Sequence, residues 1–134
     1  MVKYFLFTGP LSHLKYFKEH EYVQQNSNHK KRLSELSKDD YVIFYASSTD
    51  PETKNPYHKF IAIGRVTNPK IYTVKVNDVE YHRMKVKFES YDEQPIADKI
   101  KKLKFITNKK YYGLFFISGF REISKSDFDV IKEK

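Results

Sequence analysis

The clearest folding signal in the sequence is a pair of β-strands joined by a two-residue turn. Residues 71–76 and 79–89 are rich in β-forming side chains, and Asn77-Asp78 between them is typical of a tight hairpin. The second arm alternates, with His82, Met84, Val86 and Phe88 on one face and Tyr81, Arg83, Lys85, Lys87 and Glu89 on the other. This alternation predicts an antiparallel strand with one buried face and one basic, solvated face.

Three further apolar runs predict buried strands, at residues 4–7, 41–46 and 60–66. Gly64 within the third run indicates either a bulge or a close approach of two backbones. Asn68-Pro69 is expected to end that strand. Residues 21–27 are polar and are predicted to be irregular, with Tyr22-Val23 as an apolar anchor.

Four short helices are predicted from apolar spacing and capping signals. The first covers residues 10–20, with Pro10 in its first turn. A second helix begins with Asn28 as its cap and buries Leu33 and Leu36. A third covers residues 95–103. The last follows Ser124, which with Asp127 matches a capping box in its acidic form.

Five or six strands with short helices between them predict an α+β fold. The expected architecture is a small pseudo-barrel made of a curved, mostly antiparallel sheet with short peripheral helices. A closed barrel is one form it could take, because a small sheet must protect its edges. A chain of 134 residues without repeats or linkers is predicted to form a single domain over residues 1–134.

The charge of the chain narrows the choice of partners. A net charge of +8 favours a polyanion such as nucleic acid, although a lysine-rich surface from a biased genome stays an alternative. The absence of cysteine excludes disulfides, cysteine nucleophiles and cysteine metal sites, and suits a reducing cytoplasm. No apolar run approaches the roughly 20 residues of a membrane span. We therefore expect a cytoplasmic protein without a cofactor, and the sequence leaves the oligomeric state open.

The stretch from Phe105 to Ile123 combines aromatic residues with an amide and basic side chains. It is apolar at both ends and is interrupted by the polar segment Thr107-Asn108-Lys109-Lys110. Such a stretch can close a hydrophobic core, or it can stack a flat ring while polar groups contact the edge of the ring. Residues taken one at a time do not decide between these two roles.

Several blocks coincide in order and spacing with one known family. They are Tyr4-Phe5, Asn28-His29-Lys30-Lys31-Arg32-Leu33, the strand at 41–45, Ala62-Ile63-Gly64-Arg65-Val66, Phe105-Ile106-Thr107-Asn108-Lys109, and Arg121-Glu122-Ile123 with Asp127-Phe128. With this series the chain resembles an EVE domain, of the PUA-like superfamily that also includes the YTH and ASCH domains. The resemblance covers essentially the whole chain. Its most specific part is the F-I-x-N-K block, followed by an aromatic residue and by R-x-I-x-x-x-D-F.

The resemblance implies a PUA-like pseudo-barrel with a pocket for a flipped, often modified, base of DNA or RNA. The residues predicted for this pocket are Phe5, Asn28, Tyr45, Ser47, Phe105, Ile106, Asn108, Lys109 and Tyr112. Members of the family usually carry Trp near the first strand, around Tyr22-Val23 and after the N-K pair, whereas this chain has no Trp. A narrower or differently shaped aromatic cage is therefore expected. For single residues a structural role is the alternative. Phe105 and Tyr45 could be core residues, and Asn108 could stabilise its own turn.

Basic residues form clusters that could surround such a pocket. Residues 99–110 contain six lysines and no acidic residue, and the strand face with Arg83, Lys85 and Lys87 is also basic. The predicted phosphate contacts are Lys30, Lys31, Arg32, Lys101, Lys102, Lys104, Lys110 and Arg121. As an alternative to phosphate binding, each cluster could simply be a solvated face. Arg121 could instead form an ion pair with Asp127 or Glu122.

Enzyme signatures are weak in this sequence. His13 and His20 have no neighbouring carboxylate that would complete a metal site, and the chain has no P-loop, GxGxxG or GxSxG motif. We predict a binding module without catalytic or metal-ligating residues. Two alternatives are a small, metal-independent ribonuclease of the ASCH type, using histidine and lysine, and a binder of a free nucleotide-like molecule.

Overall fold

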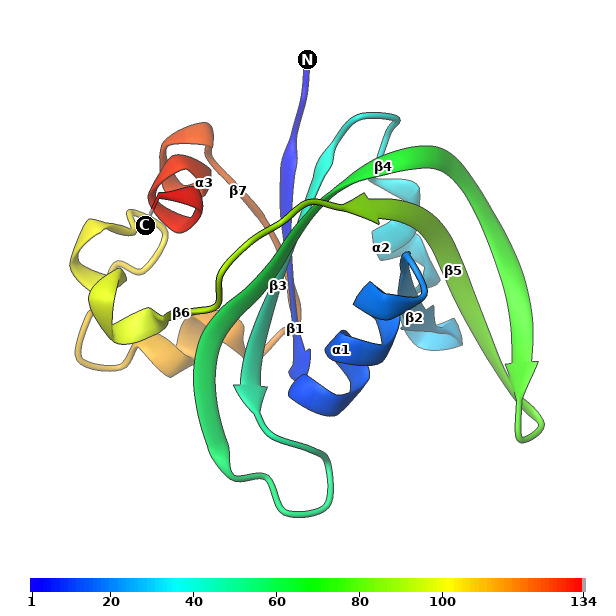
Figure 1. Ribbon diagram of the computed structural model, residues 1–134, viewed down its shortest axis with the longest axis horizontal. Coiled ribbons are helices and arrows are strands. Elements are labelled where there is room, and N and C mark those ends of the chain that lie inside the picture. Colours follow the sequence, from blue (N-terminus) through cyan, green and yellow to red (C-terminus); the bar gives the residue numbers. More distant parts are fainter. Residues whose placement is uncertain (134) are drawn as a thin grey trace.

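The computed structural model describes residues 1–133 and shows one strongly curled, mixed β-sheet (Figure 1). Its strands are β1 (Tyr4–Pro10), β2 (Tyr22–Asn26), β3 (Tyr41–Ser48), β4 (Pro56–Val76), β5 (Val79–Phe88), β6 (Gln94–Pro95) and β7 (Phe120–Ile123). The strand order is β2-β5-β4-β3-β1-β7, with β6 paired to β4. Only the β1–β3 pair is parallel among the strands of residues 1–133. The predicted α+β pseudo-barrel with a mostly antiparallel sheet is confirmed.

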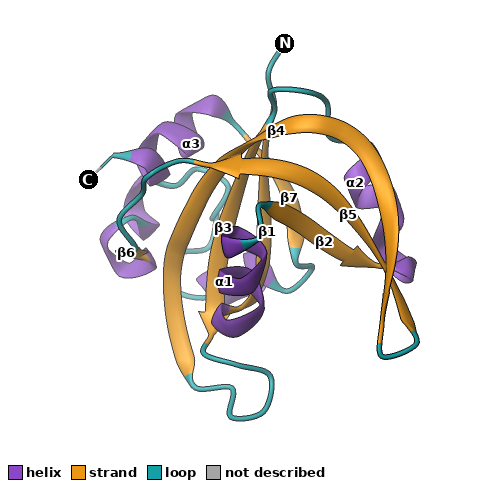
Figure 2. Cartoon of the chain, turned by 45° about the vertical axis from the view of Figure 1, so that its right-hand side comes forward, coloured by secondary structure: helices purple, strands orange, loops and turns teal. Residues whose placement is uncertain are grey.

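Short helices pack on both sides of this sheet. They are α1 (Leu11–Glu19), α2 (Lys30–Ser34) and α3 (Lys125–Lys132), with 3-10 turns η1 (Ser27–His29), η2 (Ile96–Asp98), η3 (Ile100–Lys102) and η4 (Tyr112–Phe116). Helix α1 lies within the curve of the sheet and α3 lies outside it (Figure 2). Within residues 1–133, no helix combines the length and the apolar character needed to cross a membrane.

The helix predictions are correct at both ends of the chain. Between them, the second predicted helix is present as α2 and buries Leu33, but its cap and the third helix differ from the prediction. Helix α1 begins after Pro10, and α3 is capped by Ser124, whose Oγ accepts a hydrogen bond from the Asp127 amide at 3.2 Å. Asn28 does not cap α2, because it lies inside η1 and His29 occupies the N-cap position. The helix predicted at 95–103 is two 3-10 turns that meet at Lys99, which is itself buried and donates to the Glu133 carbonyl oxygen.

The central strands are buried on both faces, and this explains their continuous apolar sequences. On β1, Phe5 and Phe7 enter one core cluster with residues of α1, α2, β2 and β5, while Leu6 enters the other. Residues of β3 alternate in the same way, with Val42 and Phe44 in the first cluster. The second cluster lies between the sheet and the C-terminal third of the chain, including α3.

Two strand predictions need correction. Residues 22–26 are not irregular but form β2, an edge strand paired with β5, anchored by the buried Tyr22 and Val23. Its polar residues hid it, because an edge strand needs little apolar surface. Asn68-Pro69 does not end a strand either: β4 continues to Val76, and shifts in register between Val66 and Tyr72 accommodate the proline.

Gly64 is a point of close approach between β4 and β5. A Cβ atom at this position would lie 2.6 Å from Cγ1 of Val86 and 2.8 Å from Cδ1 of Phe88. The pairing of Gly64 with Val42 and with Phe88 is regular, so the bulge alternative does not apply there. The hairpin turn at Asn77-Asp78 is confirmed, and both residues have positive φ, 52° and 64°.

Arg32 connects β2 with the segment that leads into β7, the two ends of the curled sheet. Its Nη1 donates to Oε1 of Gln25 on β2 at 3.2 Å, and its Nη2 donates to the carbonyl oxygen of Ser118, just before β7, at 2.7 Å. The guanidinium also lies over the ring of Phe120, 5.7 Å from its centroid. One side chain of α2 therefore bridges two strands that are at opposite ends of the sheet order.

Gly64→Ala tests the close approach in the sheet. The added methyl group would overlap Val86 and Phe88, and we expect a loss of about 1–3 kcal/mol in the free energy of unfolding, measured by urea denaturation. Gly113→Ala is the matched control, because a Cβ there would meet no atom of the described residues within 4 Å. Equal stability of the two variants would contradict this account of Gly64.

Candidate base-binding site

Two cavities share a wall at the end of β1, formed by Thr8 and Gly9. The first, here called the tyrosine cavity, has a volume of about 390 Å³ and also borders β3, β4 and η4. The second, here called the amide cavity, has a volume of about 320 Å³ and borders α1, β2 and η1. The short segment Thr8-Gly9 thus separates two candidate binding sites.

The tyrosine cavity is mostly apolar. Its polar groups include the hydroxyl of Tyr45, which lies 3.2 Å from Nδ1 of His58. The Tyr45 ring stacks on Phe116, with centroids 4.1 Å apart. Burial raises the pKa of Tyr45, so its phenol stays protonated to a higher pH than that of an exposed tyrosine. His58 has φ of 52°, a left-handed conformation in which histidine, like asparagine and aspartate, is found more often than other non-glycine residues.

The amide cavity is richer in hydrogen-bonding groups. Three consecutive residues of β2, Gln24, Gln25 and Asn26, line it together with His13 and His29. Aromatic and aliphatic side chains complete the lining: Phe7, Leu14, Phe17, Val23, Phe44 and Tyr81. In the part of the chain that the structure describes, no acidic side chain lines this cavity. Flat apolar walls beside neutral amides and basic groups suit an uncharged ring attached to an anion.

The amides of β2 differ in how far they are already engaged. Oε1 of Gln24 accepts a hydrogen bond from Nε of Arg83 at 2.8 Å, and the side chain of Gln25 bonds to Arg32 and to the Gln24 carbonyl oxygen. Asn26 is exposed, and its side chain makes no hydrogen bond to another residue of the range 1–133. Its amide can therefore donate and accept toward a ligand at the same time.

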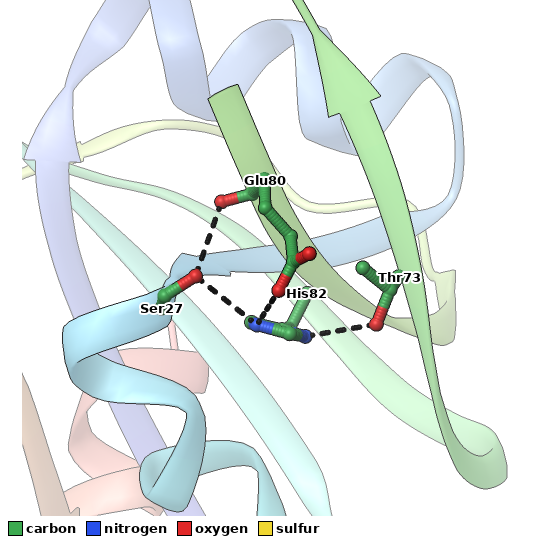
Figure 3. A network of polar contacts seen from close by, with 4 residues as sticks. All are labelled: Ser27, Thr73, Glu80 and His82. Carbon is green, nitrogen blue, oxygen red and sulfur yellow. Dashed lines mark hydrogen bonds and ion pairs between the residues drawn. The ribbon is translucent and has the colours of Figure 1, made fainter. Parts of the chain in front are cut away.

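A buried histidine fixes the corner where β2 meets η1 (Figure 3). Nδ1 of His82 lies 3.1 Å from Oγ1 of Thr73, and Nε2 lies 3.4 Å from Oγ of Ser27 and 3.5 Å from Oε1 of Glu80. Ser27 directly follows Asn26, so this network connects the β4–β5 hairpin to the edge of the amide cavity. The sequence predicted the inward orientation of His82 but not this positioning role.

The predicted pocket residues are dispersed in the structure. Tyr45 and Ser47 line the tyrosine cavity, whereas Phe5 and Ile106 are fully buried in the core and line neither cavity. Phe105 packs edge-on against Phe116, with centroids 5.8 Å apart, and Tyr112 packs edge-on against His58, at 6.0 Å. These two aromatic rings surround residues of the tyrosine cavity without belonging to its lining.

The polar members of the predicted pocket have other contacts. Oδ1 of Asn108 accepts from the amide of Tyr111 at 3.3 Å, which is the turn-stabilising role left open above. The ammonium of Lys109 donates to the carbonyl oxygen of Leu103. Asn28 is exposed and lines neither cavity, although its neighbours Asn26 and His29 line the amide cavity.

The predicted phosphate contacts separate into exposed and engaged side chains. Those of Lys30, Lys31, Lys101, Lys104 and Lys110 are exposed, and that of Lys102 is exposed but pairs with Glu133, with Nζ 3.4 Å from Oε1. Arg32 is committed to the fold, as described above, and Arg121 lies over the rings of Phe105 and Phe115, at 5.3 and 5.6 Å. Asp127 does not pair with Arg121, because its carboxylate accepts from the backbone amides of Lys104 and Phe105 at 2.6 and 3.0 Å.

Sequence reasoning missed the amides of β2 and did not assign His13 or His29 to a pocket. A signal was present, because three amide residues follow the buried pair Tyr22-Val23. That signal becomes informative only once β2 is known to pair with β5, since the pairing brings Tyr81 next to these amides. In the described residues, no three His, Asp or Glu side chains are close enough together to hold a metal ion.

Comparisons with known proteins identify the family of the chain. The family model of the EVE domain matches residues 3–134. A UPF0310 protein of Bacillus licheniformis is 35% identical over 100 residues, which are 74% of this chain and 68% of the relative. A UPF0310 protein of Mycolicibacterium gilvum is 31% identical over 112 residues, 83% of this chain and 79% of the relative.

Solved structures share the fold at low sequence identity. Human THYN1, solved in complex with DNA containing 5-methylcytosine, has a TM-score of 0.57 at 13% identity and covers 98% of both chains. The N-terminal domain of McrB from Staphylothermus marinus has a TM-score of 0.59 at 11% identity, over 96% of this chain and 92% of its own. These likenesses identify the fold as a PUA-like pseudo-barrel. The chain belongs to the EVE domain family, the one that its sequence pattern resembles.

The buried phenol of Tyr45 predicts a specific loss of stability in alkali. Burial raises the pKa of Tyr45 above its ordinary value of 10.0. Above pH 10 the unfolded chain therefore loses a proton that the folded protein keeps, so the stabilising contribution is complete below pH 10 and is lost as the pH rises. Urea denaturation from about pH 8 to 11 should show a shallower decline for Tyr45→Phe than for the original protein.

Tyr111→Phe provides the comparison, because it removes a hydroxyl from an exposed ring. If the pH profiles of Tyr45→Phe and Tyr111→Phe coincide, burial of the Tyr45 phenol is not the cause of the alkaline loss.

Proposed function

We propose that this EVE domain binds DNA that carries a modified base, and that the modified base enters the amide cavity. The observation that carries this proposal is the combination, in one cavity without acidic side chains, of aromatic walls and a row of amides. The volume of about 320 Å³ lies within the range of roughly 300–1,000 Å³ that is typical of small-ligand sites.

The chemistry of Asn26 supports recognition of a base edge. A base presents donors and acceptors side by side, and a side-chain amide matches such a pair with its own oxygen and nitrogen. The partly exposed rings of Phe17 and Tyr81 offer stacking surfaces, each worth roughly 1–3 kcal/mol per base. Inside a duplex these edges and faces are occupied, so the base has to leave the stack to enter the cavity.

Electrostatics supports a polyanionic partner. His13, His29 and Arg32 are the basic groups that line the amide cavity, and the net charge of the chain is +8. The THYN1 structure, a complex with DNA containing 5-methylcytosine, supports the choice of DNA and of a modified cytosine as the first ligand to test. The exposed lysines of residues 101–110 would then contact phosphates outside the cavity.

One observation favours a second function. His13 and His29 line the same cavity, and two histidines could act as general base and general acid in the cleavage of RNA without a metal. Incubation of single-stranded RNA with the protein in EDTA tests this alternative. Cleavage that disappears in His13→Ala and in His29→Ala would establish the ribonuclease, and intact RNA would eliminate it.

Asn26→Ala tests the base-binding proposal. We expect it to lower the preference for a duplex with one 5-methylcytosine over the same duplex with one thymine at that position, because the two bases share the methyl group and differ at the edge that the amide contacts. One bidentate contact discriminates between base edges by about 1–3 kcal/mol. Fluorescence anisotropy titrations with both duplexes measure this preference, and thermal denaturation verifies that the variant folds.

Asn28→Ala is the matched comparison, because Asn28 is also an exposed asparagine but lines neither cavity. A loss of preference in Asn28→Ala and not in Asn26→Ala would reject the amide cavity and restore the pocket predicted from the sequence.

The exposed lysines predict a steep dependence of DNA affinity on salt. Each phosphate contact contributes about −0.9 to the slope of log affinity against log salt concentration. Replacement of Lys101, Lys102 and Lys104 with alanine should flatten this slope by up to about 3 units without a loss of melting temperature. A control with the exposed Lys54, Lys70 and Lys75 replaced removes the same charge elsewhere. Equal slopes for the two triple variants would show that only net charge matters.

A further inference from the structure

Large apolar side chains are exposed on the segment around η4. Leu114 is 62% exposed, Ile117 76% and Tyr111 55%. The other strongly exposed large hydrophobic residues of the described chain are scattered at the N-terminus, on α1 and at the β4–β5 hairpin. Three such residues within seven positions form an apolar projection that a free protein surface rarely carries without a partner.

This projection is presented by a well-anchored backbone. Phe116 is buried against Tyr45, and Phe115 is half-buried beside the Arg121 guanidinium. The amide of Leu114 donates to the carbonyl oxygen of Tyr111 at 3.1 Å, and that of Gly119 donates to the carbonyl oxygen of Phe116 at 3.2 Å. Leu114 and Ile117 therefore point outward because Phe115 and Phe116 hold the segment from below.

The chain that leads into the projection is basic in sequence, and its exposed lysines include Lys101, Lys104 and Lys110. Residues 99–121 contain six lysines and Arg121 but no aspartate or glutamate. Lys109 and Lys110 directly precede the segment, and the ammonium of Lys110 lies 5.3 Å from the centre of the Tyr111 ring. An apolar tip with a basic border is complementary to the stacked bases and the phosphates of a nucleic acid duplex.

The projection also lies beside both cavities. Ile117 lines the tyrosine cavity, and the carbonyl oxygen of the next residue, Ser118, accepts a hydrogen bond from Arg32. Arg32 in turn lines the amide cavity. The backbone next to Ile117 is thus hydrogen-bonded to a lining residue of the amide cavity.

We propose that Leu114 and Ile117 form a wedge that enters the base stack of duplex DNA and fills the space left by the base that moves into the amide cavity. This inference rests on the proposed function and assigns to Leu114 and Ile117 the role of opening the duplex. Extraction of a base leaves an apolar gap between its neighbours, and Leu and Ile are side chains suited to fill such a gap. A single strand has no such gap, so the wedge contributes only when the target is a duplex.

The test compares Leu114→Ser/Ile117→Ser with the matched control Val76→Ser/Val79→Ser, whose valines are exposed at the hairpin. Three probes are used: a duplex with one 5-methylcytosine, its unmodified counterpart, and the single strand with the 5-methylcytosine. We expect the wedge variant to bind the modified duplex about tenfold more weakly and the single strand unchanged. 2-Aminopurine next to the modified base should brighten with the original protein and with the control, but not with the wedge variant.

The outcomes separate the wedge from the proposed function. If the original protein has no preference for 5-methylcytosine in either the duplex or the single strand, the proposed function fails and the wedge fails with it. If the preference exists but the wedge variant loses affinity equally for duplex and single strand, or loses none, the wedge alone is rejected. Sedimentation that shows a dimer dissociated by the wedge substitutions, with unchanged 2-aminopurine signals, would assign this surface to self-association and likewise reject the wedge.

Discussion

The structure depends on the burial of β1 and β3 on both of their faces. Because these two strands have no solvated side, the chain has to cover each face with a separate group of elements. The cover on one face comes from α1, α2 and β2, and the cover on the other comes from the C-terminal third. At Thr8-Gly9 β1 is still paired with β3 but no longer with β7, and there the two covers separate and each leaves a cavity. The candidate site is therefore a consequence of how the sheet is covered.

Polar side chains in this protein often serve the backbone. Asp127 fixes the amides of Lys104 and Phe105, Lys99 donates to a carbonyl oxygen of the C-terminal segment, and Lys109 donates to the carbonyl oxygen of Leu103. The 3-10 turns between β6 and β7 leave many backbone groups without regular partners, and buried groups of this kind need a hydrogen bond. A basic composition therefore overstates the number of cations that are available to a polyanion.

The parts of the fold that could be predicted from the sequence are those with a local pattern. Alternation defined β5, apolar spacing with Pro10 defined α1, and the Ser124 cap defined α3. Strand β2 and the continuity of β4 depend on pairing with β5, and no local pattern carries that information. The same holds for the residues that line the two cavities. Tyr45 and Ser47 were predicted because they lie on β3, which has a local pattern, whereas the amides lie on β2, which was predicted to be irregular.

The contact between Arg32 and Ser118 has a consequence for how sequences of this kind can diverge. Because the guanidinium bonds to the main-chain carbonyl oxygen of position 118, any side chain at that position preserves the contact. Position 25 has no such freedom, since there the acceptor is the side chain of Gln25 itself. Substitutions among homologues should accordingly accumulate at 118, while 25 and 32 change together. Lysine in place of Arg32 lacks the planar fork that serves both partners at once.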